Sequence, residues 1–262
     1  MSVLKKNNVV IKGSGDATIV FSHGFGCDQA TWRFVAPAFE ATYRTVLFDH
    51  VGAGSSDFSC YHPQRYNSLM QYADDLIDIC VQLNLTDIIF VGHSVSAMIG
   101  AIAAIKAPQY FAKIIMVAPS PCHMNDGGYR GGLERSDIDS LIDFLDDNYL
   151  GWARVMAPQI MGDSNGLELA EDLTDSFCRT DPVAAKQFAR VTFLSDSRSV
   201  VAHLTTPTLI LQCSNDAIAP ESVGRYLESV LPDATFLQMT ATGHCPHLSA
   251  PEETIEAIRS FL

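Results

Sequence analysis

Basic side chains are scarce in this chain. It holds 17 lysines and arginines against 30 aspartates and glutamates, which gives a formal net charge of −13. Nucleic acids and anionic membrane surfaces are bound through clusters of positive charge. We therefore expect neither nucleic acid nor a membrane as a partner, and we expect a substrate that is not a polyanion.

The number of cysteines is odd, and their spacing along the chain shows no pattern of disulfide pairs. The 7 cysteines are scattered, and some, such as Cys80 and Cys213, lie inside apolar segments. Such a set is typical of reduced thiols rather than of a disulfide framework. The first residues, 1–8, also lack the apolar core of a signal peptide. These two features predict a cytoplasmic protein.

The longest apolar stretch is too interrupted to cross a membrane. Residues 88–105 are broken by Gly92, His93 and Ser94, whereas a transmembrane helix needs about 20 consecutive, predominantly apolar residues. We interpret the stretch as a buried strand followed by a buried helix, with the polar residues in the turn between them.

From residue 17 onward, strand-like and helix-like segments alternate. The strand-like segments are short, rich in Val, Ile and Leu, and apolar on both faces, as in a parallel sheet covered by helices. They are residues 18–22, 45–49, 87–91, 113–118, 208–213 and 235–239. The helix-like segments are residues 31–39, 68–84, 96–106, 220–230 and 251–261. We expect residues 8–12 to add a leading antiparallel strand.

Residues 120–200 interrupt this alternation, because they lack clear strand patterns. Their helical patterns cover residues 138–149, 166–178 and 181–193. A helical insertion between two strands of a parallel sheet lies over the strand ends, where it covers a pocket. We therefore expect an α/β core, residues 1–119 and 201–262, with a helical lid, residues 120–200.

The lid should supply apolar side chains to the wall of the pocket. The candidates for this wall are Tyr129, Trp152, Met156, Phe177, Phe188, Phe193 and Leu194. We expect four of them to bind substrate, namely Tyr129, Trp152, Met156 and Phe193. The alternative is that such side chains only form the core of the lid, since apolar residues at helical spacing usually pack against one another.

A serine stands in the turn between a predicted strand and a predicted helix. The turn reads Gly92-His-Ser94-Val-Ser96. A serine on so sharp a turn is pushed out of the backbone at the start of the helix, which is the geometry of a nucleophile elbow. The usual pattern, G-x-S-x-G, ends in glycine where this chain has Ser96. A chance Gly-x-Ser between a strand and a helix is the alternative interpretation.

A glycine-rich loop follows the strand-like segment 18–22. It reads His23-Gly-Phe25-Gly, and its glycines allow the backbone to approach a ligand closely. Hydrolases with a nucleophile elbow hold the oxyanion on two backbone N–H groups, one from the residue after the nucleophile and one from such a loop. We expect the two donors to be Val95 and Phe25.

An acidic residue and a histidine follow the last two predicted strands. Asp216 comes just after residues 208–213, and His244 just after residues 235–239. Open α/β sheets place their sites at the carboxyl ends of strands, so we predict that Ser94, Asp216 and His244 form a catalytic triad. Taken singly, Asp216 could be a turn residue or a helix cap, and His244 could be an ordinary surface histidine.

No metal and no cofactor are expected. His244, Cys245 and His247 are close in the sequence, and both residue types bind zinc, but no fourth ligand stands at zinc-site spacing and a proline interrupts the cluster. Cys27 and Cys122 lie near the predicted site. Nothing in the sequence marks a base beside either of them, so we interpret both as structural thiols.

The whole chain resembles the α/β-hydrolase superfamily. Residues 49–57 match its Asp-x-x-Gly-x-Gly-x-Ser loop, in addition to the elbow and the order Ser94, Asp216, His244 along the chain. Further segments resemble one subfamily, which contains the bacterial stress-signalling hydrolase RsbQ and the plant karrikin and strigolactone receptors. These segments are residues 23–29, 92–98, 119–122, 177–182, 185–188 and 242–247. Ser96 resembles the plant receptors, whereas the Cys-Pro-His after His244 resembles RsbQ.

This resemblance implies an α/β-hydrolase fold, with a mostly parallel sheet, helices on both faces and a four-helix lid over a small apolar cavity. It implies a serine hydrolase that cleaves a small hydrophobic ester or lactone through Ser94, Asp216 and His244. It also implies a stress-signalling role, since RsbQ works with a sensor-type protein phosphatase that activates a sigma-factor pathway. The alternative is a ligand-binding receptor with slow hydrolysis that passes a signal to a partner protein.

Overall fold

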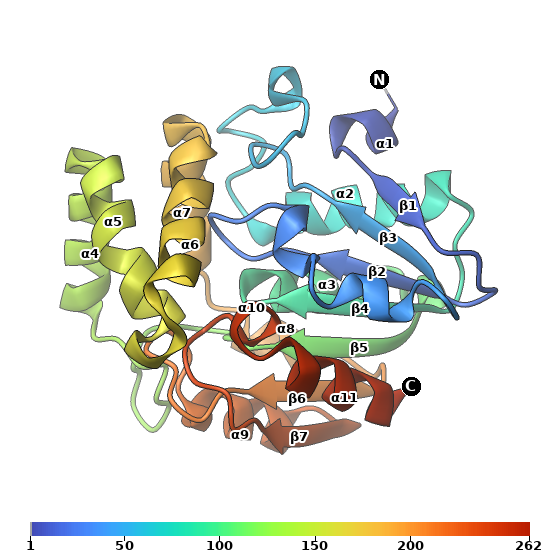
Figure 1. Ribbon diagram of the computed structural model, residues 1–262. Coiled ribbons are helices and arrows are strands. Elements are labelled where there is room, and N and C mark those ends of the chain that lie inside the picture. Colours follow the sequence, from blue (N-terminus) through green and yellow to red (C-terminus); the bar gives the residue numbers. More distant parts are fainter. Residues whose placement is uncertain (1) are drawn as a thin grey trace.

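The computed structural model describes residues 2–262 (Figure 1). Within these residues the strands form one seven-stranded sheet of order β1-β3-β2-β4-β5-β6-β7. Only β1 runs antiparallel to its neighbour, and the remaining neighbours are parallel. The strands are β1 (Val10–Lys12), β2 (Thr18–Ser22), β3 (Arg44–Phe48), β4 (Ile88–His93), β5 (Phe111–Val117), β6 (Thr208–Gln212) and β7 (Ala234–Gln238).

Helices lie on both faces of this sheet and beside it. The α-helices are α1 (Val3–Lys6), α2 (Leu69–Gln82), α3 (Val95–Lys106), α4 (Arg135–Asp147), α5 (Tyr149–Met161), α6 (Leu167–Arg179), α7 (Pro182–Phe193), α8 (Arg198–Val201), α9 (Glu221–Val230), α10 (Pro246–Ser249) and α11 (Pro251–Phe261). The 3₁₀ helices are η1 (Gln29–Trp32), η2 (Ala36–Phe39), η3 (Phe58–Cys60), η4 (Pro108–Tyr110) and η5 (Asp163–Asn165). Among the helices of residues 2–262, none combines the length and the apolar character that crossing a bilayer requires.

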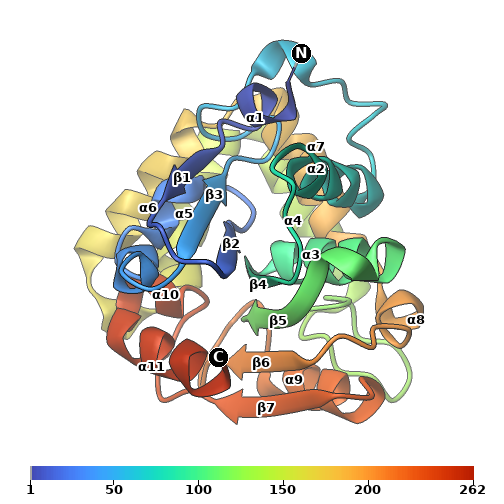
Figure 2. The same cartoon turned by 90° about the vertical axis from the view of Figure 1, so that its right-hand side faces the viewer.

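The two faces of the sheet build two separate apolar cores. Successive strand residues point to opposite faces, so Val20 packs on the side of α2 and α3, while Phe21 packs on the side of η1, η2 and α11. Figure 2 shows α2 and α3 on one side of the sheet and α11 on the other. Both side chains are fully buried, which stabilises the fold by roughly 1.5–3 kcal/mol each. The expected mostly parallel sheet with helices on both faces is confirmed.

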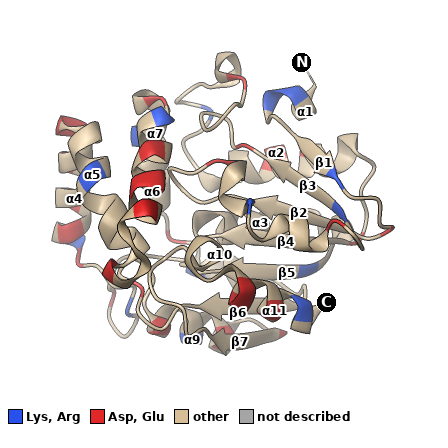
Figure 3. Cartoon of the chain, in the orientation of Figure 1, with Lys and Arg blue, Asp and Glu red and all other residues tan. Residues whose placement is uncertain are grey.

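Helices α4, α5, α6 and α7 are inserted between β5 and β6. Figure 1 shows them at the end of the sheet toward which the parallel strands point. Their apolar sides form a third core, which includes Trp152, Leu173 and Phe177. Acidic side chains gather on α4 and α6 (Figure 3), where most are exposed to solvent. The insertion therefore places charge outward and apolar surface toward the strand ends. Its division from the core at residues 120 and 200 stays a prediction.

The prediction of one helix over residues 31–39 is wrong. The structure has two short 3₁₀ helices here, η1 and η2, and Pro37 stands in the first turn of η2. Proline lacks an N–H and its ring collides with the carbonyl four residues earlier, so a continuous α-helix is disfavoured.

Helix α5 was not predicted. It begins after Asn148, whose side chain accepts a hydrogen bond from the N–H of Gly151 at 2.9 Å. It also contains Pro158 near its end, a residue that local patterns assign to a break. Burial of Trp152 and Ala153 in the third core overrides that local preference.

Candidate active site

Ser94 lies at the turn from β4 into α3 in a strained backbone conformation. Its φ of 56° and ψ of −122° are rarely adopted by a residue with a side chain, and such strain costs about 1–3 kcal/mol. The Ser94 N–H donates to the carbonyl of Val117 at 2.8 Å, which holds the turn against β5. A Cβ at Gly92 would lie 2.7 Å from the backbone of Ser96, so the first position of the turn requires glycine.

The structure brings Ser94, His244 and Asp216 together. Oγ of Ser94 lies 2.8 Å from Nε2 of His244, and Nδ1 of His244 lies 2.7 Å from Oδ2 of Asp216. All three side chains are buried. These contacts form a continuous hydrogen-bonded chain from the hydroxyl to the carboxylate.

The other carboxylate oxygen of Asp216 fits the interpretation of this residue as a turn residue. Oδ1 accepts the backbone N–H groups of Ile218 and Ala219 at 2.8 and 3.0 Å. The loop after β6 is thus closed by the same carboxylate that faces His244. The bonds to Oδ1 orient Oδ2, so the two interpretations do not exclude each other.

The backbone groups of Phe25 and Val95 are free to act as donors. In the part of the chain that the structure describes, neither N–H donates a hydrogen bond to another residue. Val95 is the first residue of α3, where N–H groups have no partner within the helix. Phe25 precedes Gly26, whose φ is +72° and whose Cβ, if present, would lie 1.7 Å from the ring of Phe177. The loop therefore lies directly against α6.

A small, mostly apolar cavity of about 30 Å³ lies over Ser94. Its walls come from the loop after β2, from the elbow, from helices α5 to α7 and from the loops after β5, β6 and β7. The lining residues are Phe25, Cys27, His93, Ser94, His123, Ile160, Leu173, Phe177, Thr192, Phe193, Ile218, His244 and Cys245. The ring of Phe25 contacts the rings of Phe177 and Phe193 at centroid distances of 5.6 and 6.1 Å.

Of the four residues expected to bind substrate, Phe193 lines this cavity. Trp152 is fully buried one layer behind it, where its ring contacts Phe25 and Phe177. Met156 is half-buried against the same apolar core. Tyr129 lies elsewhere, with its hydroxyl donating to the carbonyl of Cys122 at 2.7 Å.

Of the remaining candidates for the wall of the cavity, one lines it and two do not. Phe177 lines the cavity. Phe188 does not line the cavity, because its ring lies between Tyr72, at a centroid distance of 4.5 Å, and the lining residue Phe25, at 5.9 Å. Leu194 is 48% exposed. Helical spacing alone did not distinguish side chains that face the cavity from those that form the core of the insertion.

Sequence reasoning missed several lining residues, among them His123. Burial lowers the pKa of His123 to about 4, so its ring is neutral near pH 7. Its Nδ1 lies 3.3 Å from the carbonyl of Ile218, two residues after Asp216. The usable signals were its place just after the Pro119–Cys122 segment and the place of Ile218 in the loop of the predicted acid. Thr192 and Ile160 carry no such signal.

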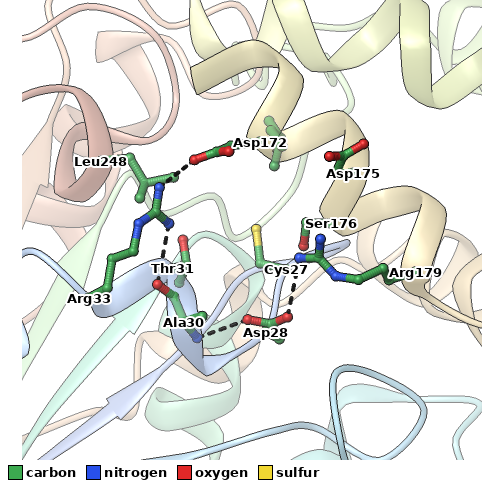
Figure 4. Close-up of a pocket in the computed structure, with 11 residues that line it drawn as sticks. Cys27, Asp28, Ala30, Thr31, Arg33, Asp172, Asp175, Ser176, Arg179 and Leu248 are labelled. Carbon is green, nitrogen blue, oxygen red and sulfur yellow. Dashed lines mark hydrogen bonds and ion pairs between the residues drawn. The ribbon is translucent and has the colours of Figure 1, made fainter. Parts of the chain in front are cut away.

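A second, larger cavity of about 280 Å³ lies on the outer side of the site, between η1 and α6 (Figure 4). It shares Cys27 and Leu173 with the cavity over Ser94. Its rim is charged. Two ion pairs cross it, Arg33–Asp172 at 2.6 Å and Arg179–Asp28 at 3.7 Å.

Two of the histidines near the site, His244 and His247, make side-chain hydrogen bonds within the protein. His247 bonds Thr31 through Nε2 at 2.7 Å, and burial lowers its pKa to about 3. Both ring nitrogens of His244 are hydrogen-bonded, Nδ1 with Asp216 and Nε2 with Ser94. Within residues 2–262, no group of three or more His, Cys, Asp or Glu side chains is arranged to hold a metal ion. Burial raises the pKa of Cys27 to about 12, which keeps its thiol protonated.

Comparisons with known proteins identify the family and the fold. Residues 19–257 match the model of the alpha/beta hydrolase family. The chain is 36% identical over 262 residues to strigolactone esterase D14 of Arabidopsis thaliana, covering 100% of this chain and 98% of the relative. It is 35% identical over 257 residues to karrikin insensitive 2 receptor CA of Petunia hybrida, covering 98% and 95%. The structure of a hydrolase from Oleispira antarctica superposes with a TM-score of 0.97 at 42% identity, covering 99% and 95%.

Proposed function

The chain belongs to the alpha/beta hydrolase family, and from that premise we propose that it hydrolyses a small hydrophobic ester or lactone through Ser94, His244 and Asp216. The hydrogen-bonded chain from the Ser94 hydroxyl to the Asp216 carboxylate is the observation that carries this proposal. A serine hydroxyl is a weak nucleophile unless a base removes its proton, and the 2.8 Å contact with His244 supplies that base.

The proton moves along this chain in a defined direction. Nδ1–H of His244 donates to Asp216, which leaves Nε2 free to accept the proton of Ser94 as its oxygen attacks the carbonyl carbon. His244 then returns the proton to the leaving alcohol, and an acyl-enzyme remains on Ser94. Water, deprotonated by the same nitrogen, cleaves the acyl-enzyme and restores the hydroxyl.

The N–H groups of Phe25 and Val95 would receive the oxyanion that forms at each attack. Their lack of partners among the described residues supports this role, because a donor without a partner gives up no hydrogen bond when it binds the oxyanion. Loss of one such donor typically lowers the rate by about 10²–10³-fold.

The lining of the cavity favours an apolar acyl group. Phe25, Phe177 and Phe193 form much of the wall beside Ser94. The cavity is also small, at about 30 Å³. Its apolar lining and its small size together support a small hydrophobic ester or lactone as the substrate.

Substitution of the nucleophile tests this proposal. Ser94→Ala should abolish hydrolysis of p-nitrophenyl acetate and labelling by a fluorophosphonate, while the melting temperature stays close to that of the wild type. Ser229→Ala, which removes an exposed hydroxyl far along the chain on α9, is the matched control. Full activity of Ser94→Ala would refute the proposal.

A receptor function is a second candidate, and the similarity to the karrikin insensitive 2 receptor of Petunia hybrida favours it. Under this hypothesis the acyl-enzyme is long-lived and a partner protein binds that state. The finer hypothesis, a sigma-factor stress pathway with a sensor-type phosphatase as partner, rests on the resemblance to RsbQ. A rapid burst of p-nitrophenol, followed by slow turnover, would support the receptor function. Fast turnover without a burst would argue against it.

A further inference from the structure

Ser96 occupies the position where the elbow pattern has glycine, and its hydroxyl has three close partners. The Oγ of Ser96 lies 2.5 Å from the carbonyl oxygen of His23, 2.8 Å from Nε2 of His50 and 2.9 Å from Oγ of Ser22. The four residues are fully buried or within 1% of it. None of them takes part in the hydrogen bonds that connect Ser94 through His244 to Asp216.

The direction of each bond follows from the groups involved. A carbonyl only accepts, so the single proton of Ser96 goes to the oxygen of His23. The oxygen of Ser96 must then accept from Ser22 and from an Nε2–H of His50. Burial lowers the pKa of His50 well below its ordinary value, which keeps this ring neutral. Ser96 is thus saturated, with one bond donated and two accepted.

His23 extends this network to the peptide group of Phe25. Nε2 of His23 accepts the backbone N–H of His50 at 3.0 Å, so the ring proton is on Nδ1. That Nδ1–H donates to the carbonyl of Gly24 at 2.8 Å. The carbonyl of Gly24 and the N–H of Phe25 belong to one planar trans peptide and point in opposite directions. Fixing the carbonyl of Gly24 therefore fixes the direction of the Phe25 N–H.

Ser96 also belongs to the first turn of α3, next to Val95. Its hydroxyl therefore joins the element that carries one expected oxyanion donor to the loop that carries the other. We propose that Ser96 is a positioning residue, whose hydroxyl sets the distance and orientation of the Phe25 N–H relative to the Val95 N–H. This inference rests on the proposed function and gives the departure from the glycine pattern a role in that function.

Two matched substitutions test the inference. Ser96→Ala removes the bond to the His23 carbonyl, whereas Ser22→Ala removes an equally buried hydroxyl and leaves that bond in place. The kcat of Ser96→Ala on p-nitrophenyl acetate, per site titrated by a fluorophosphonate, should fall about 100-fold, since a misplacement near 1 Å costs about that much. Its KM should change less than about threefold, because the ground-state ester does not use the oxyanion donors. Ser22→Ala should lose less than about fivefold in kcat.

A second readout separates positioning from a structural role. Phenylboronic acid forms a tetrahedral anionic adduct on the serine, so its affinity depends on the oxyanion donors. That affinity should fall in Ser96→Ala in parallel with kcat/KM and stay near the wild-type value in Ser22→Ala. Should Ser96→Ala fail to fold, Ser96→Gly, which restores the usual pattern, should still show a kcat at least about tenfold below the wild type.

A wild-type kcat per titrated site in either Ser96 variant, with only the melting temperature lowered, would overturn the inference. A wild-type protein that neither turns over p-nitrophenyl acetate nor reacts with the fluorophosphonate would instead refute the proposed function. The two failures are therefore distinguishable.

Discussion

Asp216 faces His244 with one carboxylate oxygen while the other is held by the backbone of the next turn. Oδ2 lies 2.7 Å from Nδ1 of His244, and Oδ1 accepts the N–H groups of Ile218 and Ala219. The carboxylate cannot rotate without losing both backbone bonds. The ring of His244 is consequently held in the tautomer that presents an unprotonated Nε2 to Ser94.

Asp216→Asn should separate these two roles. The amide oxygen can still accept from Ile218 and Ala219, so the fold should persist, but the NH₂ group would then face His244 and favour the wrong tautomer. We expect kcat on p-nitrophenyl acetate to fall about 10³–10⁴-fold with little change in KM. A variant that keeps more than a tenth of the wild-type kcat at an unchanged melting temperature would contradict this assignment.

The contact between Gly26 and Phe177 predicts coupling between the loop after β2 and helix α6. Gly26→Ala would place a methyl group 1.7 Å from the ring at a φ of +72°, and it should lower the free energy of unfolding by more than about 2 kcal/mol. In Phe177→Leu the ring is gone, so adding Gly26→Ala should cost less there. Urea denaturation of the wild type, the two single variants and the double variant gives the coupling energy between the two positions, expected at about 1–3 kcal/mol. If the effects of the two substitutions on the free energy of unfolding are simply additive, the contact with Phe177 is not the reason that alanine is disfavoured at position 26.

Leu173 lies between the cavity over Ser94 and the outer cavity, since it lines both. Leu173→Ala should join them and admit longer acyl groups. We expect the kcat/KM for p-nitrophenyl butyrate, relative to the acetate, to rise on the order of 10-fold, as for one or two methylenes gaining an apolar site. Leu169→Ala is the matched control, because Leu169 is on the same helix and lines neither cavity. An equal change of acyl preference in both variants would rule out a partition at Leu173.

Buried histidines predict loss of stability in mild acid. Burial lowers the pKa of five of them in the folded protein, namely His23, His50, His93, His123 and His247. The unfolded chain takes up protons near pH 6.5, which the folded protein does not. Stability should therefore be full above that pH and fall as the pH decreases, by up to about 1.4 kcal/mol per pH unit for each histidine that stays neutral in the folded protein.

Urea denaturation at several pH values between 7.5 and 5 measures this dependence. His123→Gln should reduce the slope by about one proton, because the pKa of His123 lies near 4 in the folded protein. His203→Gln, at an exposed position, should leave the slope unchanged. A stability that is constant from pH 7.5 to pH 5 would contradict the assignment of these rings as buried and neutral.

Strand positions were predictable because they depend on local pattern. Residues 18–22 form β2 as expected, and the other predicted strands differ from β3 to β7 by at most two residues at either end. Helix boundaries were predicted wrongly at two prolines, because proline interrupts a helix at one position and is accommodated inside a helix at the other. Pro37 ends the expected helix, whereas Pro158 is carried inside α5 because the insertion packs around it.

The order of motifs along the chain already determined the kind of fold and the three side chains to examine. Which atoms meet was decided only by the packing of distant segments, since Ser94 and His244 are 150 residues apart and Ser96 and His50 are 46 apart. The same holds for the wall of the cavity, where Phe193 is a lining residue and Trp152 packs against Phe25 outside the lining. Apolar periodicity reports that a side chain is buried. The neighbours it is buried against depend on how α4 to α7 seat on the strand ends, and no local pattern encodes that arrangement.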